Sequence, residues 1–472
     1  MEPISADLVV VGAGPGGYAA AFYAADKGRK VLLVDEEERL GGVCLNRGCI
    51  PSKALLHATS LLREAKRSGQ VRGIAFGEPR VDLGALRAWK ESVLERLGQG
   101  IRSLGRARGV EVVRGRARFE DSRTLRVDAA GGQQLIRYQA AIIAVGSKPA
   151  VPAAFALGTD RVMTSTEALE LAEVPPTLLV IGGGYIGLEL GTVYAALGSR
   201  VVLAEAADTL LPGVDADLVR PVMRAAEQAF QAVRLRTKVL AMAAGGDQVR
   251  ATCDTPEGPR EERYDRVLVA VGRAPNCGEL GLERTQVQRD ERGFIRVDAR
   301  QRTADPAIYA IGDAVGAPLL AHKAAREARV AVEALTGEPG AAEQAVMPSV
   351  VFTDPEVAWC GLTESEAHAQ GLAVRVVKFP WSASGRAVSL DRTDGLTKLL
   401  IEPKTERILG VGLVGAGAGE LIGEGVLAIE MGATAKDLAE AVHPHPTLSE
   451  TLMECAALFY GVATHAVSRK AR

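Results

Sequence analysis

Apolar runs that end at glycine-rich turns recur along the chain. Residues 7–11 form one such run and predict a buried strand, and residues 18–26 predict an alanine-rich helix after the turn. A second strand, residues 30–34, ends at Asp35. Strand, turn, helix, strand and acid thus follow one another in the order of a dinucleotide-binding module.

The turn between the first strand and the helix supplies what a pyrophosphate needs. Gly12 allows the tight turn, Gly14 lets the backbone approach the phosphates, and Gly17 lets the helix lie close to the strand. The helix N-terminus offers free N–H groups and the positive end of a dipole. Asp35 is placed to accept hydrogen bonds from ribose hydroxyls.

The same module occurs a second time. Strands at 178–181 and 201–204 enclose another glycine turn and end at Glu205. The strand phrase at 138–149 returns almost unchanged at 264–275. One chain therefore predicts two bound dinucleotides. The glycines of the second turn and of the two phrases are Gly182, Gly184, Gly187, Gly146 and Gly272.

Glu205 indicates which dinucleotide the second module binds. A carboxylate at this point accepts from a ribose 2′-hydroxyl and repels a 2′-phosphate. The next residues, Ala206 and Ala207, supply no arginine that would favour a phosphate. We expect NAD rather than NADP.

Two further parts follow the second module. Strands at 294–297 and 308–311 return to the first module, and Asp313 points toward its ligand crevice unless it only caps the next turn. From residue 347 the pattern predicts a separate α+β domain. Its strands are predicted at 350–352, 374–379, 396–401 and 408–414, and its helices at 363–369 and 417–431. The predicted fold class is α/β, with two Rossmann-like domains and a C-terminal α+β domain.

Composition and charge exclude several classes of protein. Hydrophobic residues make up 47% and charged residues 24% of 472 residues, as in soluble globular proteins. A net charge of −2 does not indicate a basic surface for binding nucleic acid or an anionic membrane. No apolar run is long enough to span a bilayer. Six cysteines do not make a secreted disulfide framework. We expect a cytoplasmic protein without a metal site.

Cys44 and Cys49 carry the most specific chemistry in the sequence. A disulfide between them closes a very small loop and stabilises little. A regular helix would separate them by about 7.5 Å, more than bridged Cα atoms allow, so the turn must be irregular. The pair indicates a redox switch, with two free buried thiols as the alternative. Lys53, one helical turn after Cys49, would favour a Cys49 thiolate, unless it is a solvated lysine.

The C-terminal domain places His443 and His445 around a proline before a helix. A rigid segment of this kind can project an imidazole, although a single histidine is more often structural. Thr447 and Glu450 also match a helix capping box, which is the structural alternative for Glu450.

These residues together resemble the flavin-dependent pyridine nucleotide–disulfide oxidoreductases, and most closely their dihydrolipoamide dehydrogenase branch. The similarity covers essentially the whole chain. Its most specific parts are GGVCLNRGCIPSK at 41–53, GGGYIGLE at 182–189, AIGD at 310–313 and HPTLSE at 445–450. Arg47 departs from the resemblance, because the family usually has a small apolar residue there; a cation could lower a thiolate pKa.

The resemblance implies FAD in the first module and NAD in the second. Cys44 would exchange with substrate, Cys49 would face the flavin, and Lys53 would pair with Glu189. Asp313, Ala321 and Ala117 would contact FAD. The remaining cofactor contacts would include Gly146, Val239, Gly272 and Arg273.

The resemblance also implies a homodimer in which His445, oriented by Glu450, acts as acid–base residue on the other subunit. The expected domains are residues 1–149 for FAD, 150–275 for NAD, 276–346 as a central segment returning to the FAD domain, and 347–472 as the interface domain.

The implied activity is the oxidation of protein-bound dihydrolipoyl groups of 2-oxo acid dehydrogenase complexes, or of glycine cleavage, by NAD⁺. The partners would be lipoyl domains and the acyltransferase core. A related NAD(P)H-dependent reductase of another disulfide or electrophile, and a non-catalytic flavoprotein subunit, are the alternatives.

Overall fold

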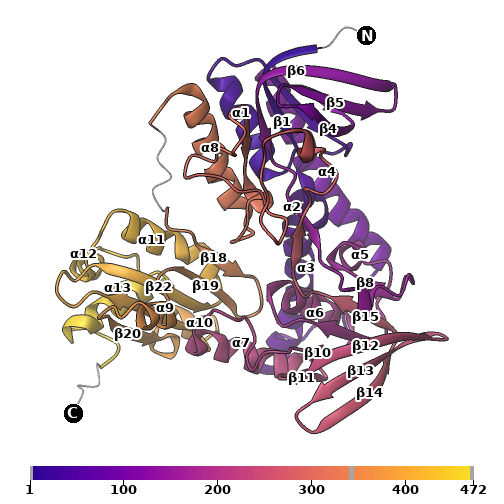
Figure 1. The fold of residues 1–472 in the computed structure, drawn as a ribbon. Helices are drawn as coiled ribbons and strands as arrows, with labels where there is room; N and C mark the ends of the chain where they lie inside the picture. Colours follow the sequence, from indigo (N-terminus) through magenta and orange to yellow (C-terminus); the bar gives the residue numbers. More distant parts are fainter. Residues whose placement is uncertain (1–3, 340–344, 468–472) are drawn as a thin grey trace.

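A mixed sheet, whose parallel strands hold the first glycine turn, lies at the N-terminal end (Figure 1). The computed structural model describes residues 4–339 and 345–467. Strand β1 (Ile4–Val11) lies between β2 (Val31–Asp35) and β6 (Gly132–Ile143), parallel to both. The apolar residues of β1 are buried almost completely, which explains its unbroken hydrophobic run. The other strands of this sheet are β3 (Glu111–Arg114), β4 (Arg116–Asp121), β5 (Thr124–Ala129) and β17 (Ile308–Ala310).

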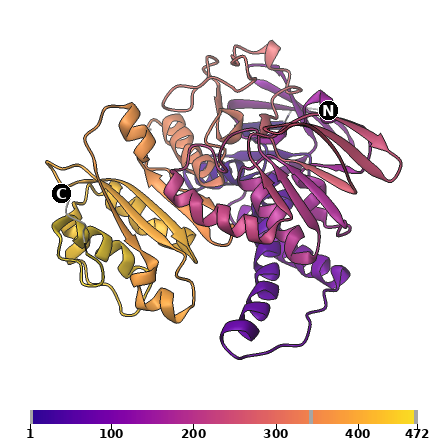
Figure 2. The same cartoon turned by 90° about the horizontal axis from the view of Figure 1, so that it is seen from below.

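Helices and a returning segment complete the first module. Helix α1 (Pro15–Asp26) packs against α8 (Ala321–Thr336). Two long helices, α3 (Cys49–Val71) and α4 (Leu83–Ala107), project from the molecule as a hairpin (Figure 2). Strand β17 pairs with β6, so residues 308–310 rejoin this sheet as expected.

The prediction of a strand at 294–297 is wrong. Ile295 makes only an isolated bridge to Arg289. Phe294 and Ile295 are nevertheless buried, and the Ile295 N–H donates to the Ala314 carbonyl at 2.8 Å. The apolar pattern there reflects burial of an irregular segment, which periodicity alone does not distinguish from a short strand.

The second module repeats the parallel arrangement. Its sheet has the order β11–β10–β9–β15–β8, with the second glycine turn between β9 and helix α6. Strands β7 (Ser147–Pro149) and β16 (Arg273–Pro275), the ends of the two recurring phrases, pair with each other and join the modules. The elements are β8 (Val162–Met163), α5 (Ser165–Glu170), β9 (Thr177–Ile181), α6 (Tyr185–Leu197), β10 (Arg200–Ala204), α7 (Ala216–Ala229), β11 (Ala232–Arg234) and β15 (Arg266–Val269).

A three-stranded antiparallel sheet inserted in the second module was not expected from the sequence. It consists of β12 (Lys238–Gly245), β13 (Gln248–Thr255) and β14 (Gly258–Tyr264). Buried and more exposed residues alternate along β13, because one face packs on the module and the other meets water, whereas β14 is mostly charged and only its last residue, Tyr264, is buried.

The C-terminal domain is an antiparallel sheet covered by helices, as expected. The sheet order is β18–β19–β22–β21–β20, and β19 was missed in the sequence. Helices α11 and α13 pack on this sheet. The elements are β18 (Ser349–Val351), β19 (Glu356–Gly361), α9 (Glu364–Ala369), β20 (Arg375–Pro380), α10 (Gly385–Ser389), β21 (Leu396–Ile401), β22 (Ile408–Gly415), α11 (Ala418–Glu430), α12 (Ala435–Glu440) and α13 (Glu450–Tyr460).

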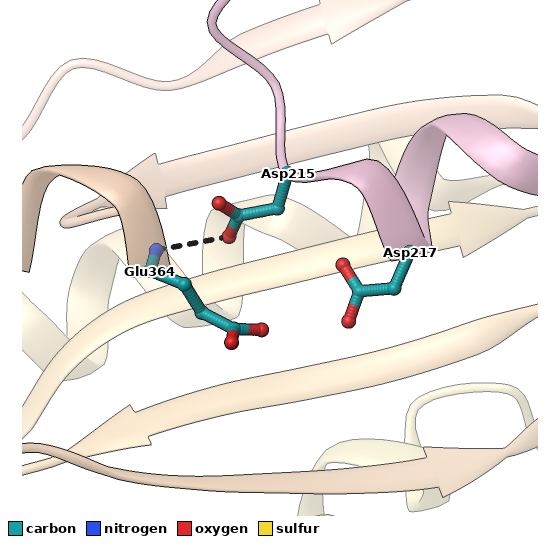
Figure 3. A group of neighbouring side chains, drawn as sticks. All are labelled: Asp215, Asp217 and Glu364. Carbon is teal, nitrogen blue, oxygen red and sulfur yellow. Dashed lines mark hydrogen bonds between the residues drawn. The ribbon is translucent and has the colours of Figure 1, made fainter. Parts of the chain in front are cut away.

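A buried cluster of charges joins the second module to the C-terminal domain. Oxygens of Asp215, Asp217 and Glu364 lie within 4.8 Å of one another (Figure 3). The Lys398 ammonium donates to all three, at 2.6, 2.7 and 2.9 Å. An ammonium therefore occupies the position that a cation would need, and the cluster is an ion-pair network between domains.

Among the residues that the structure describes, no helix combines the length and the apolar character needed to cross a bilayer.

Candidate functional site

One cavity of about 600 Å³ joins the first glycine turn to the cysteine pair. Its wall comes from both modules and from the start of α8. Predicted site residues along it are Gly12, Gly14, Asp35, Cys44, Cys49, Lys53, Ala117, Gly146, Glu189, Arg273, Asp313 and Ala321. The structure thus brings together most of the residues that were assigned to the first nucleotide.

The two glycine turns have the same construction. At Gly12, with φ of +101°, an added Cβ would lie 2.5 Å from the Ala144 carbonyl oxygen. At Gly182, with φ of +110°, it would lie 2.5 Å from the Ala270 carbonyl oxygen. Only glycine fits either position, and Gly17 and Gly187 are equally crowded against the turn. At Gly184 the structure leaves open space, as a ligand phosphate requires.

The acids at the ends of β2 and β10 also correspond. Asp35 accepts the N–H of Ala13 at 2.5 Å, and Glu205 accepts the N–H of Gly183 at 2.6 Å. Each carboxylate therefore sits against the second residue of its turn, where a ribose would lie. Burial raises the pKa of Asp35, although N–H groups of Ala13 and Glu37 act in the opposite direction.

The cysteine turn is irregular, as the spacing requires. A short helix, α2 (Gly42–Arg47), ends at Gly48, whose φ of −149° and ψ of −114° break the helical path. Helix α3 then starts at Cys49. Both cysteines are thiols in the structure. The break lets their sulfurs approach within hydrogen-bonding range.

The two thiols differ sharply in acidity. Hydrogen bonding from Cys44 and the charge of Lys53 lower the pKa of Cys49 to about 7, against the opposing effects of burial and Glu189. Hydrogen bonding to Cys49 and burial raise the pKa of Cys44 far above its ordinary value. Cys49 is therefore the sulfur that holds the negative charge when the pair is reduced.

Lys53 contacts Glu189, which was expected from the sequence, and Phe352, which was not. Its ammonium donates to Glu189 on α6 at 2.8 Å, as expected. It also lies 4.5 Å from the centre of the Phe352 ring. The other oxygen of Glu189 accepts the N–H of Phe352 at 3.0 Å. Phe352 belongs to the C-terminal domain, and no local signal in the sequence marks it.

Asp313 lies in a polar network at the junction of the modules. It accepts from the hydroxyl of Ser147 at 2.5 Å, and the Arg273 guanidinium donates to the same hydroxyl at 2.7 Å. Arg273 also lies 4.0 Å from the Asp313 carboxylate. Asp313 lines the cavity, and the turn that contains it has no side-chain cap. Ser147 was missed, although it directly follows Gly146.

The structure pairs Arg47 with a carboxylate. Its guanidinium donates to Glu37, after β2, at 2.6 Å. The charges that act most strongly on the two thiols are those of Lys53 and Glu189. Arg47 instead ties the cysteine turn to the loop that follows Asp35.

The second turn lies outside the cavity, at the carboxyl end of β9, the central strand of the second sheet. Glu205 and Gly272 follow the ends of β10 and β15 there. Val239 is buried within β12 in an apolar cluster of this module. Its side chain packs inside the module.

His445 and Glu450 form a pair in the C-terminal domain, outside the cavity. The Nδ1 atom of His445 lies 2.9 Å from Glu450, and the imidazole is largely exposed. Glu450 also accepts the N–H of Thr447 at 2.7 Å, but the Thr447 hydroxyl donates to Pro444. The predicted capping box is not formed, because α13 begins at Glu450 with Ser449 as its N-cap; Glu450 instead binds the Thr447 N–H and the imidazole of His445.

The residues of the cavity fit FAD. Gly14 leaves room for a pyrophosphate beside the start of α1, Asp35 can bind a ribose, and the cysteine pair with Lys53 lines another part of the same cavity. The open turn at Gly184 and the carboxylate of Glu205 fit NAD in the same way.

Comparison with known protein families agrees with this arrangement. Residues 6–328 match the pyridine nucleotide-disulphide oxidoreductase family, and residues 347–456 match the dimerisation domain of the same family. The chain thus carries a dimerisation domain and is a subunit of a homodimer.

Proteins of similar sequence extend over the whole chain. A dihydrolipoyl dehydrogenase of Vibrio cholerae is 45% identical over 472 residues, covering 100% of this chain and 99% of its own. Those of Haemophilus influenzae and Bacillus subtilis are 46% and 43% identical, each covering 98% of its own length.

Two solved structures of similar shape come from bacteria. LpdA from Mycobacterium tuberculosis has a TM-score of 0.88 at 26% identity, over 96% of this chain and 99% of its own. The HOCl-induced flavoprotein disulfide reductase RclA from Escherichia coli has a TM-score of 0.85 at 28% identity, over 96% and 99%. With FAD and NAD as its cofactors, the chain belongs to the pyridine nucleotide-disulphide oxidoreductase family and, within it, to the dihydrolipoyl dehydrogenases.

Proposed function

We propose that this chain oxidises protein-bound dihydrolipoyl groups through Cys44 and Cys49 and passes the electrons to NAD⁺. The observation that carries the proposal is the unequal cysteine pair in the wall of the cavity. Cys49 is the acidic sulfur, with Lys53 beside it, and Cys44 is the sulfur available for exchange. A bound FAD supplies the acceptance of an electron pair and its transfer to NAD⁺ as hydride.

His445 supplies the base. Its Nδ1–H donates to Glu450, which leaves Nε2 with a free lone pair. Nε2 takes the proton of one substrate thiol, because only the thiolate attacks a disulfide. The thiolate then bonds to Cys44 Sγ, and the Cys44–Cys49 bond breaks with its electron pair on Cys49.

Closure of the substrate ring follows. The second substrate sulfur attacks the first, the bond to Cys44 breaks, and a cyclic disulfide leaves. Of the two substrate protons, one ends on Cys44 and the other on Nε2 of His445, while Cys49 keeps a negative charge opposite Lys53. The dithiol is oxidised and the cysteine pair is reduced by two electrons.

We further propose the partners and the setting. Lipoyl domains and an acyltransferase core of 2-oxo acid dehydrogenase complexes would present the dithiol. A cytoplasmic location would keep the cysteine pair cycling between oxidised and reduced forms. The proposed domains are residues 1–149 for FAD, 150–275 for NAD, 276–346 returning to the FAD domain and 347–472 for the dimer interface; the separate sheets support these boundaries.

The test compares two reactions of the purified holoenzyme. We expect rapid NADH formation from dihydrolipoamide and NAD⁺, and little oxidation of NADPH with glutathione disulfide. His445→Gln should lower the first activity on the order of 10²- to 10⁴-fold, and bound FAD should remain, because His445 lies outside the cavity. Preference for glutathione disulfide and NADPH, or unchanged turnover in His445→Gln, would reject the proposal.

A further inference from the structure

The segment that carries His445, residues 441–446, lies between α12 and α13 and is largely exposed to solvent. Val442 is 98% exposed, and the side chain of His445 is 71% exposed. His443 is the exception, since only 7% of its side chain is exposed. A connection of this kind keeps a side chain in one place only where it is anchored, because its backbone otherwise retains conformational freedom.

His443 is anchored at both ring nitrogens. Nδ1 lies 2.8 Å from the carbonyl oxygen of Ala441, which directly follows α12. Nε2 lies 2.7 Å from a carboxylate oxygen of Glu424, on α11. The second contact therefore ties the segment to a different helix from the two between which it lies.

Both contacts are made at once only with an extra proton. A carbonyl oxygen accepts but does not donate, so Nδ1 of His443 carries a hydrogen. Nε2 of a neutral ring and an ionised Glu424 carboxylate would then both be acceptors, so a further proton lies between them. Charge-assisted bonds of this kind are stronger than bonds between neutral groups. The buried imidazole is therefore a firm link between α11 and the end of α12.

Two fixed points enclose His445. His443 holds the chain two residues before it, and Glu450 lies 2.9 Å from its Nδ1 atom on the other side. Pro444, between the two histidines, restricts the backbone φ angle, so a shift of His443 would carry the backbone of His445 with it. Both anchors together set the place of Nε2, the proton acceptor proposed above.

We propose that His443, bound to Glu424, is a positioning residue for the reaction: it fixes the segment from which His445 reaches the substrate thiol. The proposal rests on the base role proposed above for His445. Proton transfer needs the two atoms within hydrogen-bond distance, and loss of the bond should lower kcat for dihydrolipoamide by about 10- to 100-fold. Bound FAD should be retained, because neither His443 nor Glu424 lines the cavity.

Matched substitutions test the bond. His443→Leu and Glu424→Leu remove it, whereas Glu424→Gln keeps both contacts, because an amide N–H can donate to Nε2 while Nδ1–H still binds Ala441. With the holoenzyme, dihydrolipoamide and NAD⁺, kcat should fall in both leucine variants and stay near the wild-type value in Glu424→Gln. The double leucine variant should fall no further than either single one, because all three lose the same bond.

A second reaction separates positioning from folding. Reduction of ferricyanide by NADH takes electrons from the bound flavin, one for each ferricyanide, and needs neither the cysteine pair nor His445. This activity should stay at the wild-type rate in all of these variants. The matched control is Glu420→Leu, at an exposed position one turn earlier on α11, which should leave both activities unchanged.

The outcomes distinguish this inference from the proposed function. Wild-type kcat for dihydrolipoamide in both leucine variants would overturn the inference, and so would an equal loss of both activities or a loss in Glu424→Gln that matches Glu424→Leu. His445→Gln, measured alongside, tests the base role. If it alone loses dihydrolipoamide oxidation, only the inference is rejected; if it keeps the wild-type rate, the proposed function is rejected.

Discussion

At the scale of single residues, Cys44 and Cys49 show how position alone makes two identical side chains chemically different. Cys49 begins α3, receives a hydrogen bond from Cys44 and lies near the Lys53 ammonium. Cys44 lies on the other side of the Gly48 break, where burial and the neighbouring thiolate oppose its ionisation. A thiolate on Cys49 therefore forms first, and Cys44 stays protonated.

This asymmetry predicts a titration that Lys53 controls. In Cys44→Ser, where the serine hydroxyl can still donate to Cys49, alkylation of Cys49 by iodoacetamide should rise with pH around a pKa of about 7. Adding Lys53→Met removes the opposing positive charge and should move this rise to higher pH, on the order of one unit.

The matched control for this titration lies on the same helix. Lys66 is exposed on α3, so Cys44→Ser with Lys66→Met should behave as Cys44→Ser alone. An unchanged titration on removal of Lys53 would show that its ammonium does not stabilise the Cys49 thiolate.

At the scale of elements, the cluster around Lys398 joins three parts of the fold. Lys398 lies on β21, Glu364 begins α9, and Asp215 and Asp217 stand at the start of α7. Asp215 also accepts the backbone N–H of Glu364 at 3.0 Å (Figure 3). Lys398 is 1% exposed, so its charge is stabilised by these carboxylates alone.

Removing that ammonium should be costly. Lys398→Met leaves the buried carboxylate of Asp215 without its cation, although Lys378 still pairs with Asp217 and Glu364, and should destabilise the C-terminal domain by about 3–5 kcal/mol. Urea unfolding followed by tryptophan fluorescence measures this, because Trp359 and Trp381 both lie in that domain. Lys436→Met, on the exposed surface of α12, should change stability by less than about 0.5 kcal/mol. Equal midpoints for the two variants would contradict the role of the cluster.

At the scale of the whole molecule, the residues assigned to the reaction lie in two separate parts of the chain. Cys44 lines the cavity, whereas His445 and Glu450 stand in the C-terminal domain and are not part of that wall. The chain carries the dimerisation domain of its family. We propose that each cavity is completed by His445 of the partner subunit.

Hybrid dimers test this arrangement. Cys44→Ser and His445→Gln homodimers should each be inactive. When the two chains are co-expressed at equal levels, about half of the dimers are hybrids, and each hybrid has one intact site, which should restore about a quarter of wild-type activity. If His445 served the cavity of its own chain, mixing would restore nothing.

Much of the fold was predictable because its signals are local. The unbroken apolar runs of β1 and β9, and the glycines after them, are dictated by burial and by tight turns within a few residues. The family motifs around the cysteines and His445 are equally compact. Strands β12–β14 escaped prediction because short, polar, half-exposed strands resemble loops in sequence.

The sequence by itself determined most of the elements, the two nucleotide turns and the position of the cysteine pair beside the first turn, since each depends on residues close together in the chain. Only the tertiary structure decided which distant groups act on the reacting segments. Phe352 against Lys53, Glu37 against Arg47 and Glu424 against His443 are contacts made when separate elements pack. Their geometry depends on how the sheets and helices close around one another, which no local pattern encodes.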